Sequence, residues 1–295
     1  MAQVFVVIPV HNRVEQTLQC LKSVLIHKHI KLKVIVVDDG STDGTEEQIR
    51  SRFPDVTILV GDGNLWWTGA TNLGVRKALE EASPDDYILT LNNDTVLPEN
   101  YLEILFHQIE RHPHALIGSV ALDNDRREII VEAGVNINWF TAKYTYYFKN
   151  KKYRELRGRG RASYQPTVLP GRGTAIPISA FHEIGLFDQD VFPHYAADYD
   201  FSLRAAKAGY KLVVCFDLVL YSFPNLSGIA NTDARVSFRQ VLKSFRSIRS
   251  ANNLLTRFQF ARRNAPRILF PLFVMADTLR VVFGTLINRT KFSLR

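Results

Sequence analysis

The sequence has 295 residues, of which 46% are hydrophobic and 22% charged, and its formal net charge is +8. A chain of this length can bury a core large enough to fold without disulfides or structural zinc, which excludes the small disulfide-rich and zinc-dependent classes. Its only cysteines, Cys20 and Cys215, lie far apart in apolar stretches and indicate buried thiols of a reduced protein. The first residues show no secretory signal, so we expect a cytoplasmic location.

Strands and helices alternate through the first half of the chain. Apolar runs predict buried strands at 4–8, 34–37, 56–60 and 87–91, the first of them ending at Pro9. Helices are predicted around 18–25, between Asp43 and Pro54, at 70–82, and from Pro98 to Arg111, with Asp43 and Glu46 forming a capping box. This alternation predicts an α/β fold with a mostly parallel, Rossmann-like central sheet flanked by helices.

Beyond about residue 115 the alternation loosens. We expect hairpin strands within 126–150, a basic loop at 151–161, a helix at 198–209, a strand at 211–215 and helical structure from 235 onward. The predicted organisation is a nucleotide-sugar-binding half at 1–115, an acceptor-binding and catalytic half of the same domain at 116–234, and a basic helical extension at 235–295.

Three polar segments, 11–13, 38–41 and 92–94, directly follow predicted strands. Ligands of parallel α/β sheets bind at the carboxyl ends of the strands, so these segments should meet at one edge. Asp94, after two asparagines, suits Mg²⁺ or Mn²⁺ held together with a diphosphate; alternatively it only caps a turn. Asp38 and Asp39 can accept from a base imide or ribose hydroxyls, or form an ordinary Asp-Gly turn, and the chain has no P-loop.

The segment from Gly61 to Gly74 places two adjacent tryptophans among glycines. Neighbouring residues cannot share one buried face, so Trp66 and Trp67 suit stacking on a sugar or a base, with Asn64 and Asn72 as hydrogen-bonding partners. One of the two tryptophans can instead be a packing residue.

Two further segments lie in the second half. Asp198 and Asp200 either act as a general base at the edge of a cleft or only satisfy a helix N-terminus. Arg172, between Gly171 and Gly173, either brings a counter-charge to a phosphate or belongs to a simple turn.

Together and in this order, these segments resemble the family 2 glycosyltransferases of the GT-A fold, especially the branch that contains many rhamnosyltransferases. The matching segments are Val7–Arg13, Val36–Gly44, Asn64–Gly74, Leu91–Thr95, Gly185–Asp188 and Asp198–Arg204. The resemblance covers roughly residues 4 to 215 and is specific as a combination, although each segment alone is a weak signal.

The resemblance implies an inverting transfer by single displacement, with Asp94 as the metal ligand for Mn²⁺ or Mg²⁺. Asp198 is then the base, with Asp200 as the candidate to share or replace it. Residues expected to bind the donor nucleotide are Pro9, His11, Asn12, Arg13, Asp38, Asp39, Asp62, Asn64, Asn72 and Asn93. Residues expected to contact the sugar or the acceptor are Trp66, Trp67, Arg172 and Gly173.

Three positions depart from the family pattern. Asn92 replaces the first acid of the D-x-D signature, Ala197 replaces the glutamate before the catalytic aspartate, and Tyr221 stands where a metal-binding histidine is expected. These departures imply low metal affinity or a metal that arrives with the nucleotide. They also leave open a catalytically silent, scaffold-like member of the family.

The region from 235 to 295 holds 13 Lys and Arg residues against one acid, Asp277. The apolar stretch 268–287 contains Pro271, Asp277 and Arg280, which disfavours a membrane span because each mid-bilayer charge costs roughly 2.5–3.5 kcal/mol. It suits an interfacial amphipathic helix, although a core or dimer-interface helix remains an equal alternative. The basic residues that could meet anionic lipid are Arg262, Arg263, Arg267, Arg280, Arg289 and Lys291.

The sequence therefore predicts a glycosyltransferase that uses a UDP- or dTDP-sugar, rhamnose being one candidate, to extend a surface glycan or a lipid-linked acceptor. It would work in the cytoplasm or at the inner face of the cytoplasmic membrane, alone or as a homo-oligomer. A nucleotidyltransferase is the alternative enzyme class, but the 9–13 segment lacks the glycines of a triphosphate loop. A nucleic-acid partner is not expected, since no recognised binding module accompanies the basic region.

Overall fold

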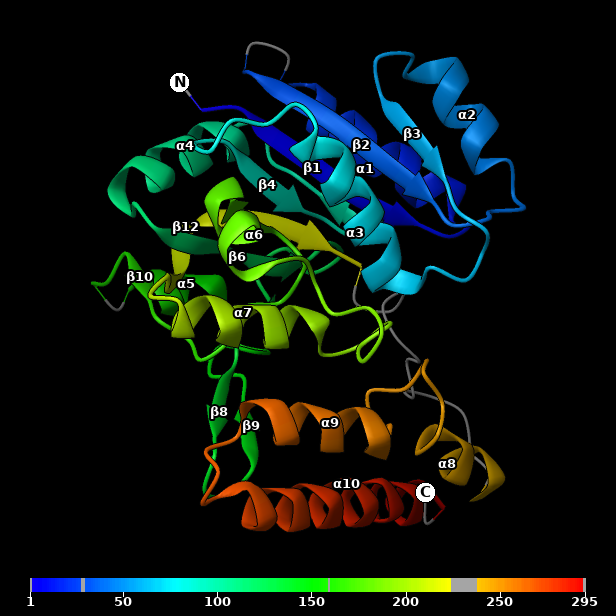
Figure 1. Ribbon diagram of the computed structural model, residues 1–295, viewed down its shortest axis with the longest axis vertical. Helices are drawn as coiled ribbons and strands as arrows, with labels where there is room; N and C mark the ends of the chain where they lie inside the picture. The colour runs from blue at the N-terminus through cyan, green and yellow to red at the C-terminus, as the bar shows by residue number, and fades with distance from the viewer. Residues whose placement is uncertain (1, 28–29, 159, 224–237, 294–295) are drawn as a thin grey trace.

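A central sheet of ten strands forms the α/β part of the computed structural model, which describes residues 2–27, 30–158, 160–223 and 238–293 (Figure 1). Its strands, together with the separate hairpin β8–β9, are β1 Val4–Val10, β2 Leu32–Asp38, β3 Thr57–Val60, β4 Tyr87–Thr90, β5 Thr95–Val96, β6 Ala115–Asp123, β7 Ile130–Glu132, β8 Asn136–Asn138, β9 Lys143–Thr145, β10 Ser163–Tyr164, β11 Thr174–Pro177 and β12 Lys211–Ser222. The helices are α1 Val14–Leu25, α2 Thr45–Arg52, α3 Trp66–Leu79, α4 Tyr101–Arg111, α5 Tyr153–Arg157, α6 Ile178–Ile184, α7 Ala197–Lys207, α8 Phe238–Ser244, α9 Leu254–Asn264 and α10 Phe270–Ser293.

The strands lie in the order β10-β12-β6-β11-β4-β1-β2-β3, while β5 pairs with β12 and β7 with β6. The four strands of the first half pair in parallel, as do β6 and β12. Strand β11 is antiparallel to both of its neighbours, β4 and β6, and joins the two halves into one sheet. The predicted mostly parallel α/β sheet is thus confirmed.

The uninterrupted apolar runs of the strands follow from burial on both faces of the sheet. In β1, Phe5 and Val7 face one core, while Val6 and Ile8 face the other. Helices α1 and α4 supply the second core, and α3, α6 and α7 supply the first. Both faces are therefore closed, and the carboxyl ends of the strands remain as the place for a ligand.

Several element boundaries differ from the predicted ones. Strand β1 continues through Pro9, still paired with β2. Its pairing with β4 has already ended at Val7, so the N–H that proline lacks would have had no partner on β4. Helix α3 begins at Trp66 rather than at residue 70. The predicted capping box is wrong: Asp43 accepts from the backbone N–H groups of Val14 and Thr45, and the residue before α2 is Gly44.

The C-terminal helices α8, α9 and α10 form a layer below the sheet, reached by the β8–β9 hairpin (Figure 1). Trp139 of the hairpin turn stacks on Phe260 of α9 and lies 5.3 Å, centroid to centroid, from Phe273 of α10. Inside this layer the guanidinium of Arg257 is paired with the buried carboxylate of Asp277. We call residues 238–293 the helical unit; the predicted boundary at 234/235 lies outside the described residues.

Cys20 and Cys215 are buried free thiols, as expected, and burial raises the pKa of each to about 12. The predicted basic loop at 151–161 includes the short helix α5. Within the described part of the chain, no helix has both the length and the apolarity needed to cross a membrane.

Candidate functional site

The three polar segments that follow β1, β2 and β4 meet at one edge of the sheet, as predicted. Nδ1 of His11 lies 2.6 Å from the carbonyl oxygen of Asp39, and the backbone N–H of Asn12 donates to Ser41 Oγ at 2.7 Å. The carboxamide of Asn93 donates to the carbonyl of Asn12 at 3.4 Å. These bonds fix the turns after the three strands to one another, with Pro9 just before the first of them.

Strained backbone marks the turn between β1 and α1. Asn12 and Arg13 adopt φ values of 60° and 67°, which is uncommon for residues with a side chain. The side chain of Arg13 reaches the segment after β4, where its Nη1 lies 3.8 Å from Oδ2 of Asp94. The turn thereby places a cation beside the predicted metal ligand.

Asp39 organises the loop after β3. Its Oδ1 accepts from the N–H groups of Gly63 at 2.8 Å and Leu65 at 3.2 Å, and its Oδ2 accepts from Trp66 N–H at 3.0 Å. Asp38 accepts from the N–H of Ser41. The same loop carries Asp62 and Asn64, and the backbone N–H of Asn64 donates to Oδ1 of Asp62 at 2.9 Å.

Asp94, which follows β4, is the predicted metal ligand. Its carboxylate is 2% exposed, and the carboxamide oxygen of Asn92 accepts from Trp67 Nε1 at 3.1 Å. No group of three or more His, Cys, Asp or Glu residues in the described ranges is arranged to hold a metal ion. One carboxylate fits a hard cation such as Mg²⁺ or Mn²⁺ only where substrate phosphates and water supply the remaining oxygen ligands.

Trp67 connects the predicted metal site to the predicted base. Its indole N–H binds Asn92, and its ring lies so close to Gly171 that a Cβ atom there would be 2.3 Å from Cζ2. The N–H of Gly171 in turn donates to Oδ2 of Asp198 at 2.8 Å. A continuous series of contacts therefore runs from the β4 end to the start of α7, and glycine is required at 171 because any side chain would collide with the indole.

Asp198 is half-buried at the N-terminus of α7. Burial is the largest influence on its carboxyl group and raises its pKa to about 6, with the negative charge of Glu132 acting in the same direction. The hydrogen bonds from Gly171 and from the Tyr199 backbone oppose this rise. A carboxylate whose pKa lies near neutrality is suited to accept a proton in the reaction.

A pocket of about 400 Å³ is bordered by Glu132 and Arg172; Asp198 does not line it, but the charge of Glu132 acts on the carboxyl group of Asp198. The pocket is lined by both charged and aromatic side chains, a combination that suits a sugar: Asp123, Arg126, Glu132, Tyr146, Lys149, Arg172 and Tyr195. Burial raises the pKa of Glu132, while Arg172 and Lys149 lower it. Neither Glu132 nor Tyr146 could be recognised from the sequence, because only the folding of β7 and the hairpin brings them to the same pocket, where their charges and that of Asp198 influence one another.

Three predicted site residues have structural contacts that argue against direct ligand binding. Asp200 is buried, and its two oxygens accept from Arg204 and from Asn264 of α9. Asn72 of α3 is buried; its side-chain amide donates to the carbonyl of Phe187, and its carboxamide oxygen accepts from the backbone N–H of Phe187. Gly173 donates to Thr90 and accepts from Ser119, which places it inside the sheet.

Trp66, whose backbone N–H donates to Asp39, is in contact with His194 and with the helical unit. The edge of its ring meets His194 at a centroid distance of 5.7 Å, and the guanidinium of Arg249, from the helical unit, lies 5.2 Å from the ring centroid. Burial lowers the pKa of His194, and the charge of Arg249 adds to this effect. The helical unit thus contributes a cation to the edge of the site, a contact that sequence spacing cannot predict.

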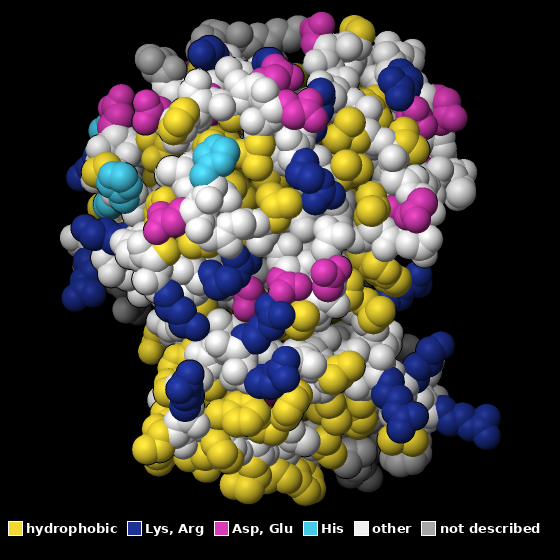
Figure 2. Space-filling model, viewed as in Figure 1, with side chains coloured by type: hydrophobic (Ala, Val, Ile, Leu, Met, Phe, Trp, Pro, Cys, Tyr) yellow, Lys and Arg dark blue, Asp and Glu magenta, His cyan; other side chains and the backbone are white. Residues whose placement is uncertain are grey.

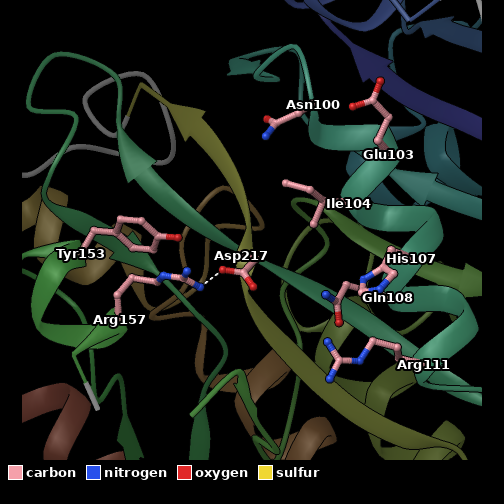
Figure 3. Close-up of a pocket in the computed structure, with 9 residues that line it drawn as sticks. All are labelled: Asn100, Glu103, Ile104, His107, Gln108, Arg111, Tyr153, Arg157 and Asp217. Atoms are coloured by element: carbon pink, nitrogen blue, oxygen red, sulfur yellow. Dashed lines mark ion pairs between the residues drawn. The ribbon is translucent and has the colours of Figure 1, made fainter. Parts of the chain in front are cut away.

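A larger cavity of about 670 Å³ lies between α4, α5 and β12 (Figure 3). Its lining includes the ion pair between Arg157 and Asp217. None of the predicted site residues lines it. The candidate site is therefore the strand-end edge together with the smaller pocket.

Two family models match the chain: Glycosyl transferase family 2 over residues 5–164 and Glycosyl transferase family group 2 over residues 87–277. An uncharacterized glycosyltransferase of Rickettsia bellii is 36% identical over 112 residues, covering 38% of this chain and 16% of that protein. An N-acetylglucosaminyl-diphospho-decaprenol L-rhamnosyltransferase of Mycobacterium tuberculosis is 25% identical over 202 residues, covering 62% of this chain and 63% of the relative.

Solved structures share the fold. The mannosyltransferase PcManGT from Pyrobaculum calidifontis, in complex with GDP-Man and Mn²⁺, has a TM-score of 0.58 at 16% identity, over 98% of this chain and 75% of that one. GalNAc-T7 with UDP, GalNAc and Mn²⁺ has a TM-score of 0.60 at 17% identity, over 75% of this chain and 44% of that one.

Proposed function

The chain belongs to glycosyl transferase family 2, and we propose that it transfers a sugar from a nucleoside-diphosphate donor to a hydroxyl group of a glycan or lipid-linked acceptor. The observation that carries the proposal is the contact series from Asn92 through Trp67 and Gly171 to Asp198. It holds the predicted diphosphate end and the predicted base in one rigid arrangement. Such an arrangement is what a displacement between two bound substrates requires.

In the proposed reaction the acceptor lies in the pocket bordered by Glu132, with its hydroxyl directed toward Asp198. Asp198 takes the hydroxyl proton, the acceptor oxygen forms a bond to the anomeric carbon, and the bond from that carbon to the diphosphate breaks. The electron pair of the broken bond leaves with the diphosphate. Attack from the face opposite the leaving group inverts the anomeric carbon, as the single-displacement proposal requires.

The donor nucleotide would lie along the strand-end edge, against the turns of residues 9–13 and 38–41 and the loop of residues 61–66. Asp39 would act there mainly by holding that loop, since its carboxylate accepts three backbone N–H groups. Arg13 would offset diphosphate charge near Asp94. A Mg²⁺ or Mn²⁺ ion bound by Asp94 and the donor oxygens would stabilise charge on the leaving diphosphate.

One relative and the pocket support the proposed substrates. The M. tuberculosis relative is named for rhamnosyl transfer to a diphospho-decaprenol-linked sugar, which supports a rhamnosyl donor and a lipid-linked glycan acceptor. We propose a UDP- or dTDP-sugar as the form of that donor. Tyr146, Tyr195 and Glu132 offer the apolar faces and hydrogen-bond acceptors that sugars use. We place the reaction in the cytoplasm, at the inner face of the membrane that would carry such an acceptor.

Nucleotide binding tests the proposal. The thermal unfolding temperature is measured with UDP, dTDP and GDP and with their sugars, each in Mn²⁺, in Mg²⁺ and in chelator. We expect at least one nucleotide to stabilise the protein in the presence of metal, because a ligand that binds only the folded state raises its stability. Asp94→Asn should lose the metal-dependent part of that rise, whereas the matched surface variant Asp55→Asn should keep it.

Turnover separates an enzyme from a silent scaffold. The stabilising nucleotide sugar is incubated with the protein, and hydrolysis or transfer is followed by release of the nucleoside diphosphate. Release with the wild-type protein supports the proposal, and binding without any release favours the silent alternative suggested by Asn92, Ala197 and Tyr221. If no nucleotide stabilises the protein under any metal condition, the proposal is wrong.

A further inference from the structure

Helix α10 is apolar on two opposite faces. Phe273, Asp277 and Val281 recur every four residues on one face and are buried. Phe273 contacts Trp139 and Tyr144 of the β8–β9 hairpin. Met275, Leu279 and Phe283 recur every four residues on another face, and they are 57%, 48% and 56% exposed. A helix that only packs on a soluble protein has a polar outer face, so this second apolar stripe needs another explanation.

The exposed stripe continues beyond α10. Ile268, just before the helix, is 89% exposed, and Phe258 of α9 contacts Phe270 at a ring distance of 5.8 Å. Leu255 lies one helical turn before Phe258 and is also exposed. Figure 2 shows apolar side chains gathered over α10 at the end of the molecule farthest from the sheet. We define the outer apolar face as Leu255, Phe258, Ile268, Met275, Leu279 and Phe283.

Positive charge accompanies this face. Lys243, Arg246, Arg262 and Arg267 are exposed in the helical unit, and Figure 2 shows Lys and Arg side chains around the apolar end of the molecule. The only acid between residues 238 and 285 is Asp277, which is buried and paired with Arg257. The side chains of Arg289 and Lys291, also predicted to meet lipid, lie outside the described part of the chain.

We propose that the outer apolar face docks on the surface of an anionic bilayer, with its apolar side chains between the lipid headgroups and its basic residues against their phosphates. Charge decides between a bilayer and a second copy of this chain. A symmetric dimer through this face would bring the basic residues of both copies together without an exposed acid from the helical unit to neutralise them. An anionic bilayer supplies the opposite charge and accepts the apolar side chains.

The inference deepens the proposed function, because a lipid-linked acceptor would reach the enzyme at such a surface. The β8–β9 hairpin connects the two: its flanks carry Glu132 and Tyr146 of the pocket, and Trp139 and Tyr144 pack against Phe260 and Phe273 of the helical unit. The docking face and the acceptor pocket thus belong to one packed arrangement.

Sedimentation with vesicles tests the docking. The full chain is mixed with vesicles of phosphatidylcholine alone or of phosphatidylcholine with phosphatidylglycerol, and the bound fraction is measured at low and high salt. We expect binding to the anionic vesicles that weakens with salt. The combined variant Met275→Gln, Leu279→Gln, Phe283→Gln should bind at least about tenfold more weakly, since each removes apolar surface from the interface. Arg262→Gln with Arg267→Gln should lose much of the preference for anionic lipid.

Controls keep the outcomes distinct. Leu279→Gln alone is compared with Ile26→Gln on the α/β part. The two side chains are similarly exposed, at 48% and 46%, and only the first substitution should weaken vesicle binding. Each variant should also keep the wild-type nucleotide response in the thermal shift, so that a failure of the proposed function is seen separately from a failure of docking. The inference is overturned if the wild-type chain stays in the supernatant with both vesicle types. It is equally overturned if the wild-type chain is a dimer that the combined α10 variant dissociates.

Discussion

Asp198→Asn should abolish sugar transfer without weakening the fold. The asparagine has almost the same shape as the aspartate and can still accept one of the two backbone N–H groups, from Gly171 at 2.8 Å or from Tyr199 at 2.9 Å. It cannot accept a proton from the acceptor hydroxyl. Activity and stability should therefore respond in different ways, which separates a catalytic role from a structural one.

The magnitude follows from the pKa of the aspartate. Folding raises the pKa of Asp198 from 3.8 to about 6. The protonated carboxyl group therefore contributes to the stability of the folded state fully below pH 3.8, and this contribution is lost as the pH rises through about 6. At neutral pH the ionised carboxylate thus costs the folded state on the order of 3 kcal/mol relative to a group with an unshifted pKa. The substitution removes that cost and leaves one N–H without its partner, a loss of about 1–3 kcal/mol. The expected result at pH 7 is a stability equal to or above that of the wild type.

Two measurements check this expectation. Urea denaturation compares the free energies of unfolding at pH 7 and at pH 4, where any advantage of the variant should shrink because the wild-type carboxyl is then protonated. Release of nucleoside diphosphate in the presence of acceptor should fall by at least about two orders of magnitude, the usual contribution of a general base. A variant with the wild-type rate would remove Asp198 from the mechanism. A variant that is inactive but unfolded would contradict the stability reasoning.

Three further substitutions have definite expected outcomes. Glu132→Gln removes a negative charge that raises the pKa of Asp198, so the acid limb of the pH profile of kcat/KM should move to lower pH; an unmoved limb would show that the two groups do not interact. Gly171→Ala forces a Cβ atom against the ring of Trp67 and should lower the free energy of unfolding by about 1–3 kcal/mol, which an unchanged urea midpoint would contradict. Arg257→Ala leaves a buried carboxylate without its ion-pair partner and should cost about 3–5 kcal/mol, seen as early proteolysis of the helical unit; wild-type resistance would refute it.

The sheet and its functional edge could be predicted because their signals are local. Strands covered on both faces are largely apolar, as β1, β4 and the buried part of β2 are, and the polar residues at 11–13, 38–41 and 92–94 lie at or just after the ends of these strands. Parallel pairing then brings their ends together, and the hydrogen bonds between His11, Asn12 and the residues after β2 confirm it. Neither signal depends on which helix covers which face of the sheet.

The structural use of a polar side chain could not be predicted in the same way. Asn72 lies in a motif of polar and aromatic residues, yet its carboxamide bonds to Phe187, 115 residues away. Asp200 is two residues from Asp198, yet it binds Asn264 of α9. Helical geometry directs positions i and i+2 to different faces, but which of those faces meets the pocket depends on a partner from a distant part of the sequence.

The β8–β9 hairpin gives the helical unit a role beyond that of an appended basic tail. The segment just before it carries Glu132 and the segment just after it carries Tyr146, both at the pocket. Between them, Trp139 and Tyr144 pack on Phe273 of α10. We infer that a change in how α10 is seated reaches the acceptor side over these few residues, whereas the turns after β1, β2 and β4 lie elsewhere in the sheet. Arg249, which precedes α9, contacts Trp66 of the donor loop, so we place donor choice in the strand-end turns with their loop and acceptor choice in the hairpin with α9 and α10. Exchanging residues 130–150 together with 254–293 between relatives should then change the acceptor and leave the donor unchanged.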